Sequence, residues 1–380
     1  MKTTAAERAV KARHGVVCSL PDDFYGYFGW PTVCSLDDGT LAAAASGFRA
    51  DHICPFGRTV ICSSSDRGES WSPPRVVNDT PLDDRDAGLL ALGGSELLLS
   101  WFTFDTRTKD VWSTRETRKP GARERYEAAL DRITDSRVRT WLGSWLRFSA
   151  DGGDSWEPPL RVPVTTPHGP IRLERGELLY LGKEYPGASG ELPDAGQRIA
   201  AYGSFGRGRS WVRLGTVPLH PGTRVENYHE PHAVELPGGR LLGLIRLEED
   251  RKTMNLRSRG LIDFSMMQTE STDGGRSWSP AVPLGFHGSP PHLLLHSGGT
   301  LVCVYGHRLE PYGQRAMISG DAGRSWEYDY VLRKDGFDWD LGYPSSVELE
   351  NGSIFTVYYQ KKDSAEEKCS LLWTRWELPG

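Results

Sequence analysis

One pattern, Ser-x-Asp-x-Gly-x-Ser-Trp, recurs through the whole chain and constrains its fold more than any other feature. Intact copies begin at Ser64, Ser149, Ser271 and Ser319, and a fifth copy, from Ser204, has Gly in place of the aspartate. Asp accepts hydrogen bonds from the amides of a tight turn, Gly permits backbone conformations that strain other residues, and Trp buries a large ring. Each copy therefore predicts a rigid turn between two strands, and their recurrence indicates a stack of repeated sheets.

A weaker repeat predicts six β-hairpins. In each, a Pro or an equivalent residue leads into a short apolar strand, a turn that contains Gly, and a second apolar strand. Six such hairpins favour an all-β fold, a six-bladed β-propeller of four-stranded antiparallel sheets that occupies residues 1–380 as a single domain. The hairpins run from Pro31 to Leu41, Asp86 to Leu97, Pro170 to Leu178, Pro231 to Leu241, Pro291 to Leu301 and Pro344 to Ile354.

Two further segments complete the predicted architecture. Residues 13–20 and 368–378 are strand-like, and we expect them in one blade, where their pairing closes the ring and removes two exposed edges. Residues 123–142 do not fit a blade, because Tyr126, Leu130 and Ile133 recur with helical spacing. This helical insertion is either a cover on the flank of the propeller or a lid or dimer contact.

Composition restricts the partners and the compartment. The 380 residues carry a net charge of -5, which gives no basic surface for nucleic acid. The six cysteines have no CxxC spacing, which is typical of reduced thiols in the cytoplasm. The charged N-terminal residues contain no apolar run, so we expect neither a signal peptide nor a membrane partner. We therefore expect a cytoplasmic protein, of open oligomeric state.

The first strand of each propeller blade lines the central axis. Residues beside the start of each hairpin should therefore converge on one central pocket, although they lie far apart in the sequence. These residues are Trp30, Arg85, His168, Glu230, Pro290 and Tyr343, with His232 and His292 just after their prolines.

These residues resemble the sialidase (neuraminidase) superfamily of BNR, or Asp-box, repeat proteins. Glu230 begins the run Glu-Pro-His-Ala-Val-Glu-Leu, which leads to Arg246 at the spacing of that family. Tyr343, in Gly-Tyr-Pro-Ser-Ser, follows Arg315 at a similar separation to that in the family. The resemblance implies that Tyr343 is a catalytic nucleophile assisted by Glu230, and that Arg246 and Arg315 bind a substrate carboxylate.

The resemblance is looser in the first blade. Arg49 resembles the arginine that follows the first inner hairpin of sialidases, and Asp51 lies near the position of their acid/base aspartate, a role for which His52 competes. Sialidases begin this blade with the first of three carboxylate-binding arginines, whereas this chain has Gly29 there. Because paired guanidinium groups bind a carboxylate bidentately, this departure argues against sialic acid unless Arg49 or Arg85 substitutes.

The resemblance implies an exo-acting glycoside hydrolase that removes a terminal acidic sugar with retention of configuration. A tyrosine needs a base such as Glu230 to act as nucleophile, because the pKa of a free phenol is near 10. A neutral nucleophile avoids repulsion from a carboxylate beside the anomeric carbon. Carbohydrate is the expected partner, and neither a metal nor an organic cofactor is required.

Several alternatives remain open. Tyr343 packs at the axis without a catalytic role if Glu230 and Arg246 form only a structural ion pair. Asp86 either pairs with its neighbour Arg85 or binds a substrate hydroxyl. In a second hypothesis a non-sialic sugar, such as a uronic acid, is cleaved by a hydrolase or lyase that uses histidine. Its candidate residues are His52, His168 and His292. A third hypothesis is a glycan-binding propeller without catalytic activity.

Overall fold

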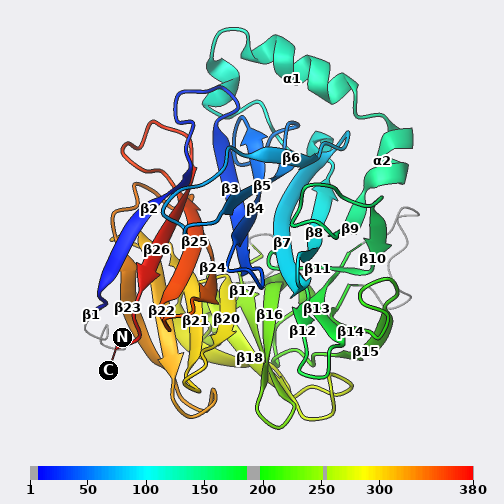
Figure 1. Ribbon diagram of the computed structural model, residues 1–380. Coiled ribbons are helices and arrows are strands. Elements are labelled where there is room, and N and C mark those ends of the chain that lie inside the picture. The colour runs from blue at the N-terminus through cyan, green and yellow to red at the C-terminus, as the bar shows by residue number, and fades with distance from the viewer. Residues whose placement is uncertain (1–6, 186–196, 251–254, 380) are drawn as a thin grey trace.

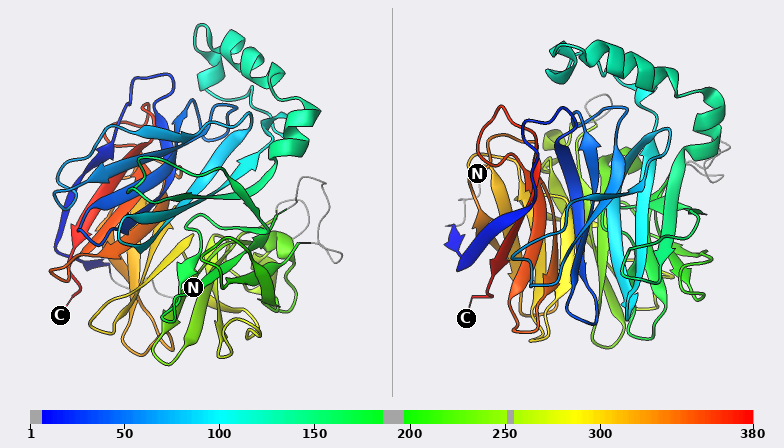
Figure 2. Two further views of the ribbon diagram at one scale, coloured as in Figure 1. Left: turned by 45° about the vertical axis from the view of Figure 1, so that its right-hand side comes forward. Right: turned by 45° about the horizontal axis from the view of Figure 1, so that its top comes forward.

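Six small sheets surround a common axis in the computed structural model, which describes residues 7–185, 197–250 and 255–379. The innermost strands of neighbouring sheets pack against one another, and the other strands extend outward from them (Figures 1 and 2). The sheets are antiparallel apart from one short added strand. The six-bladed β-propeller predicted from the six hairpins is confirmed.

Blades one to three follow the order of the chain, and each begins on its inner side. Blade one contains β3 (Tyr27–Ser35), β4 (Leu41–Arg49), β5 (Arg58–Ser64) and β6 (Arg75–Asn78). Blade two contains β7 (Asp83–Gly93), β8 (Glu96–Phe104), β9 (Gly143–Ser149) and β10 (Leu160–Val162). Blade three has two short inner strands, β11 (Val164–Thr165) and β12 (Ile171–Arg172), and then β13 (Leu178–Glu184), β14 (Ile199–Ser204) and β15 (Val212–Thr216).

Blades four to six complete the ring. Blade four contains β16 (Tyr228–Leu236), β17 (Arg240–Leu247), β18 (Ser265–Ser271) and β19 (Val282–His287). Blade five contains β20 (Pro291–Leu295), β21 (Leu301–His307), β22 (Gly313–Ser319) and β23 (Glu327–Arg333). Blade six contains β24 (Gly342–Glu348), β25 (Ile354–Gln360) and β26 (Ser370–Trp376).

The N-terminal segment closes the ring as predicted. Strand β2 (Ala12–Cys18) pairs antiparallel with β26 and becomes the outer strand of blade six. A two-residue strand that the sequence did not indicate, β1 (Arg8–Ala9), pairs parallel with β23 at the edge of blade five. The first two strands of the chain therefore belong to adjacent blades, five and six.

The repeated turns join the third and fourth strands of blades one to five. In the first copy, Ser64 Oγ donates to Asp66 Oδ1 over 2.7 Å, and the Ser70 amide donates to the same oxygen over 2.9 Å. Trp71 Nε1 donates to the carbonyl of Gly68 over 3.1 Å. The Trp71 ring lies 6.1 Å from the ring of Phe355 in the preceding blade, so the turn also helps to join two blades.

Apolar side chains fill the interfaces between adjacent blades. Among the described residues, each of the six interfaces has its own buried cluster. The cluster between blades six and one includes Phe28, Trp30, Phe355, Tyr359 and Trp373. Burial of apolar surface stabilises the ring at every interface, since no sheet covers both of its faces alone.

The helical insertion predicted over residues 123–142 forms two helices between β8 and β9. They are α1 (Ala122–Asp131) and α2 (Asp135–Trp141), after the short η1 (Thr106–Thr108) and η2 (Glu116–Arg118). Two more short helices, η3 (Val225–Asn227) and η4 (Arg257–Arg259), lie in blade four. Figure 1 shows α1 over the end of the propeller where the inner strands begin. No helix among the described residues is long and apolar enough to cross a membrane.

Candidate functional site

Four inner strands share a β-bulge at the same place, and one residue in each bulge has a left-handed backbone. These residues are Trp30, Asp86, Glu230 and Tyr343, with φ of 53°, 50°, 50° and 51°. Bulky residues rarely adopt positive φ, which costs about 1–3 kcal/mol each and is typical of functional sites. The repeated strain marks the start of the inner strands as the candidate site.

The bulge in blade two shows that the sequence-based alignment of its inner strand with the other blades is wrong by one residue. Asp86 has the left-handed conformation, and Ala87 takes the place of the proline in the other three bulges. Arg85, which the sequence placed beside the axis, therefore lies one position before the bulge. Burial raises the pKa of Asp86 to about 7, with a further contribution from the charge of Glu230 and an opposing one from Arg85. Its role toward a substrate hydroxyl remains a prediction.

Tyr343 and Glu230 meet across the axis, as the sequence predicted. The phenol of Tyr343, from β24, donates a hydrogen bond to Glu230 Oε1, from β16. Arg246 Nη1 donates to Glu230 Oε2 over 2.6 Å and to the Tyr343 oxygen over 3.1 Å. Arg246 Nη2 donates to Glu248 Oε2 over 2.6 Å. Two residues that lie 113 positions apart, in blades four and six, thus belong to one hydrogen-bonded group.

The charges in this group determine where its protons lie. Burial raises the pKa of Tyr343 well above its ordinary value, and the charge of Glu230 raises it further. Burial also acts to raise the pKa of Glu230, but the charge of Arg246 and the hydrogen bonds from Tyr343 and Arg246 outweigh it and lower that pKa. At neutral pH the phenol therefore keeps its proton and donates it toward an ionised carboxylate.

A cavity of about 710 Å³ opens beside this group. Of the residues singled out from the sequence, His52, Arg246 and Tyr343 line it. The sequence reasoning missed the other polar and aromatic residues of its wall. They include Glu248, Arg257, Asp263, Phe264, Arg308 and Trp339.

Arg308 is the missed residue for which the sequence contained a usable signal. It follows β21 directly, much as Arg246 lies near the end of β17 in the preceding blade. Its guanidinium group lies 5.6 Å from the Tyr343 ring centre and 5.7 Å from that of Phe264. It donates to the carbonyls of Ser289 and Leu341, which fixes its position in the wall. Aligning the ends of the second strands of the blades would have identified it.

The side chains of Arg49 and Arg85 bind other groups of the protein. Arg49 is fully buried, and its Nη1 and Nη2 donate to the two oxygens of Asp83 over 2.5 and 2.9 Å. Arg85 Nη1 also donates to Asp83, over 3.2 Å. The two guanidinium groups lie 4.7 and 4.1 Å from the ring centre of Trp30. Neither lines the cavity, so the predicted contacts of these arginines with substrate are not supported.

Arg315 also lies away from the cavity. Its side chain is 2% exposed. The guanidinium group donates to Glu7 Oε1 over 3.1 Å and to the carbonyl of Arg333 over 3.0 Å. Glu7 belongs to the N-terminal segment that closes the ring. The resemblance placed Arg315 on a substrate carboxylate, whereas the structure gives it a role at the edge of blade five.

Aromatic side chains surround Gly29, the position where the resemblance predicts an arginine. A Cβ at Gly29 would lie 3.2 Å from the Tyr27 ring and 3.7 Å from the Tyr359 ring. The hydroxyls of both tyrosines donate to Asp340, over 3.0 Å each to Oδ1. Aromatic rings and a buried carboxylate thus occupy the space beside the position where the resemblance predicts an arginine.

Asp51 and His52 follow β4, and only His52 reaches the cavity. Asp51 Oδ1 accepts a hydrogen bond from the His52 amide over 2.7 Å, so its carboxylate caps its own loop. The predicted acid/base role of Asp51 is not supported by this position. His52 Nδ1 lies 2.8 Å from Asp340 Oδ1 and 3.2 Å from the Tyr27 hydroxyl.

His168 and His292 lie in the axial core with His232, not in the cavity wall. The ring centres of His168 and His232 lie 4.9 and 4.5 Å from that of His292. Burial, and then the neighbouring histidines, hold the pKa of His168 and His292 well below its ordinary value, so the rings are neutral. Their predicted contacts with substrate are not supported. Within the described part of the chain, no group of three or more histidine, cysteine or carboxylate side chains has the arrangement of a metal site.

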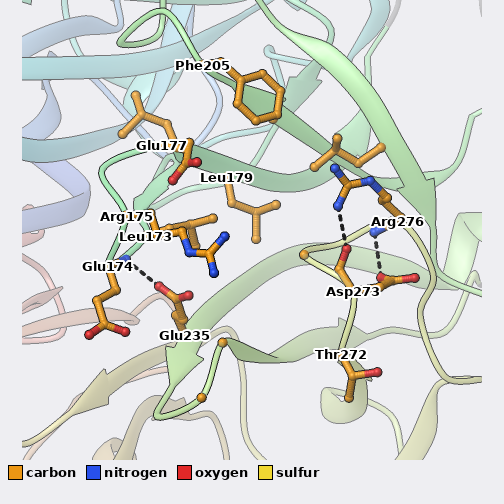
Figure 3. Close-up of a pocket in the computed structure, with 16 residues that line it drawn as sticks. Leu173, Glu174, Arg175, Glu177, Leu179, Phe205, Glu235, Thr272, Asp273 and Arg276 are labelled. Carbon is orange, nitrogen blue, oxygen red and sulfur yellow. Dashed lines mark hydrogen bonds between the residues drawn. The ribbon is translucent and has the colours of Figure 1, made fainter.

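A second cavity, of about 690 Å³, lies at the opposite ends of the inner strands of blades three and four. The hairpin turns at Leu173 and Gly239 and the repeated turn at Asp273 form its wall (Figure 3). Two of its charged side chains bond to nearby backbone: Glu235 accepts from the Glu174 amide, and Arg276 Nη1 donates to the Asp273 carbonyl. It contains none of the residues predicted for catalysis.

Comparison with solved structures agrees with this architecture. A protein of unknown function from Dyadobacter fermentans superposes with a TM-score of 0.72 at 19% identity, over 97% of this chain and 99% of that one. The NanB sialidase of Streptococcus pneumoniae gives 0.64 at 12% identity, over 96% and 70%. The intramolecular trans-sialidase of Ruminococcus gnavus gives 0.61 at 15% identity, over 96% and 97%. At these identities the likeness concerns the fold alone.

Comparison of sequences adds the family. No curated protein matches this sequence. Residues 132–356, more than half of the chain, match the family described as BNR repeat-like domain. The match includes three of the four intact repeated turns, from Ser149, Ser271 and Ser319. The chain therefore belongs to the BNR repeat-like domain family and has the six-bladed propeller that sialidases share.

Proposed function

We propose that this protein is an exo-acting glycoside hydrolase that removes a terminal acidic sugar with retention of configuration. The observation that carries the proposal is the hydrogen bond between Tyr343 and Glu230 at the wall of the 710 Å³ cavity. A phenol paired with a buried carboxylate has the arrangement needed for a base-assisted nucleophile. Arg246, which donates to both groups, holds them in register.

In the first chemical step, Tyr343 Oη attacks the anomeric carbon and Glu230 accepts the phenolic proton. The glycosidic bond breaks, the leaving oxygen takes a proton from a general acid, and a covalent sugar–tyrosine intermediate forms. Water, which gives a proton to that same group, then attacks the same carbon, the bond to Tyr343 breaks, and Glu230 returns the phenolic proton to Tyr343. Two displacements at one carbon give retention. Removal of the Tyr343 hydroxyl therefore stops the first step.

The charges in the cavity wall support an acidic sugar. Arg246, Arg257 and Arg308 line the cavity together with the carboxylates of Glu248 and Asp263. Arg308 uses three of its five N–H groups on backbone carbonyls, which leaves donors for a ligand. A substrate carboxylate beside Arg308 and Arg246 would be bound by charge-assisted hydrogen bonds.

The arginines differ from the set that the resemblance predicts for binding sialic acid. The resemblance predicts three arginines on one carboxylate, but Gly29 occupies the first position and Arg315 is paired with Glu7. Only Arg246 of the expected three lies at the cavity. A uronic acid, whose carboxylate lies at a different position on the ring, is the second candidate substrate.

The test is turnover of a panel of para-nitrophenyl glycosides of N-acetylneuraminic, glucuronic and galacturonic acids, glucose and galactose. We expect release of nitrophenol from an acidic glycoside, and a loss of at least about 1000-fold in kcat for Tyr343→Phe. Tyr358→Phe is the matched control, because that hydroxyl bonds to Thr374 within blade six.

Three results would contradict the proposal. Equal turnover by wild type and Tyr343→Phe would remove the nucleophile. A product with a new carbon–carbon double bond would indicate a lyase. Binding of the acidic sugars without any product would indicate a glycan-binding propeller.

A further inference from the structure

The proposed mechanism needs a group that protonates the departing oxygen, and one side chain in the cavity wall has the required chemistry and support. His52 is 29% exposed and lines the same cavity as Tyr343. The Trp30 ring contacts both side chains: its centre lies 5.1 Å from that of the His52 ring and 6.3 Å from that of the Tyr343 ring. His52 therefore lies on the cavity wall near the nucleophile.

The imidazole is held by a buried carboxylate. Asp340 Oδ1 lies 2.8 Å from His52 Nδ1, and the same carboxylate accepts hydrogen bonds from the Tyr27 and Tyr359 hydroxyls. Burial acts to raise the pKa of Asp340, but the charge of His52 and these hydrogen bonds outweigh it and hold that pKa at about 2. An ionised Asp340 accepts a hydrogen bond from Nδ1–H of His52, which leaves Nε2 as the nitrogen that exchanges a proton.

Hydrogen bonds also hold the backbone of His52. Its carbonyl accepts from Arg49 Nη2 over 3.0 Å and from Arg85 Nη1 over 2.9 Å. Its amide donates to Asp51 Oδ1. Arg49 and Arg85, which the sequence assigned to substrate, thus support the loop that carries His52. The Asp51 carboxylate bonds to the backbone of the same loop.

We propose that His52, oriented by Asp340, is the general acid and base of the glycosidase. This inference rests on the proposed function and names the residue that acts with Tyr343. Asp340 is a positioning residue, because it contacts the imidazole and does not line the cavity.

The proton balance is complete without a further reactant. In the first step, imidazolium Nε2–H gives its proton to the glycosidic oxygen as the bond to the anomeric carbon breaks, and the leaving group departs as an alcohol. In the second step, neutral Nε2 takes a proton from the attacking water as the bond to Tyr343 breaks. The sum is one glycoside and one water converted to one sugar and one alcohol.

The experiment compares leaving groups in His52→Ala, Asp340→Asn and Asp51→Asn. The probes are the para-nitrophenyl and methyl glycosides of glucuronic acid and of N-acetylneuraminic acid. Nitrophenolate leaves without protonation, whereas methanol does not. For His52→Ala we expect a loss of about 100-fold or more on the methyl glycoside and a much smaller loss in the glycosylation of the enzyme by the nitrophenyl glycoside, measured as the initial burst.

Two further measurements separate catalysis from structure. Added imidazole should restore part of the His52→Ala activity, and Asp340→Asn should show the same selective loss to a smaller degree. Thermal unfolding of each variant, with His52→Gln as a second substitution, checks that the propeller is intact. A uniform loss on both leaving groups, or a selective loss in Asp51→Asn instead of His52→Ala, overturns the inference. Absence of turnover by wild type overturns the proposed function and with it this assignment.

Discussion

At the scale of single residues, Gly206 is the position where the fifth repeated turn departs from the other four. The turn keeps its other bonds: the Gly208 amide donates to Ser204 Oγ over 2.7 Å, and Trp211 Nε1 donates to the Gly208 carbonyl over 3.0 Å. A Cβ at Gly206 would meet only Ser210 Oγ, at 3.7 Å. The turn therefore has room for an aspartate at position 206, and Ser210 can act as the hydrogen-bond donor to its carboxylate.

Gly206→Asp should stabilise the protein by about 0.5–1 kcal/mol. The new carboxylate would accept hydrogen bonds from Ser210, and loss of Gly reduces the conformational freedom of the unfolded chain. Urea unfolding of wild type and variant measures the change. The reciprocal control is Asp273→Gly, which should destabilise the protein. An unchanged or lower stability of Gly206→Asp would contradict this account of the turn.

The arginines show what could be predicted for the site from sequence and what could not. Order and spacing along the chain correctly brought Arg246 to Tyr343 and Glu230, because the blade repeat fixes how far each strand end lies from the axis. Nothing in the sequence near Arg49 or Arg315 reveals that their partners are Asp83 and Glu7. Roles that depend on a distant carboxylate were beyond sequence reasoning, and so was the link between His52 and Asp340.

At the scale of elements, the helical insertion packs on the loop that presents His52. Tyr126, from α1, is fully buried, with its ring centre 4.9 Å from that of Phe56. Together with Ala50, Cys54 and Val111 it forms a separate apolar cluster. The sequence left open whether the insertion covers the flank of the propeller or is a lid or dimer contact, and in the structure α1 packs against the loop of residues 50–56.

Tyr126→Ala should loosen this loop without unfolding the blades. Loss of a buried aromatic ring removes packing worth about 3–5 kcal/mol, here confined to one small cluster. Hydrogen exchange should become faster in residues 50–57, and turnover should fall if His52 is the acid. Arg137→Ala, on exposed surface of α2, is the control. Unchanged exchange in this loop would show that the insertion does not support it.

At the scale of the whole molecule, the ring of blades brings together residues that are far apart in the chain. Tyr343 and Glu230 are separated by 113 positions and form a hydrogen bond because both begin inner strands. Two repeats in the sequence were sufficient to predict six blades, and strand-like ends predicted the closing pair. The parallel pairing of β1 was not predictable, since two residues carry no periodic pattern.

The repeated turns also give the molecule a predictable response to acid. Hydrogen bonds from serine hydroxyls and amides lower the pKa of Asp66, Asp151, Asp273 and Asp321 to about 2. Because these carboxyls have a lower pKa in the folded state than in the unfolded state, their stabilisation is present above about pH 4 and is lost as the pH falls toward 2.

Thermal unfolding from pH 5 to pH 2 should therefore show a steady decrease in stability. Replacement of the four aspartates by asparagine should lower the stability at pH 5 and weaken its dependence on pH. The same pH dependence in wild type and in the fourfold variant would show that other groups control acid unfolding.

The central claim is that Tyr343 forms a covalent bond with the sugar, and trapping that bond tests it most directly. The protein is incubated with difluoro-N-acetylneuraminic acid or with a fluoroglucuronyl fluoride, and the label is located by peptide mass spectrometry. The account predicts one sugar per chain on Tyr343, and none in Tyr343→Phe. A label on Glu230 or Asp86, or no label from a sugar whose glycosides are turned over, would contradict it.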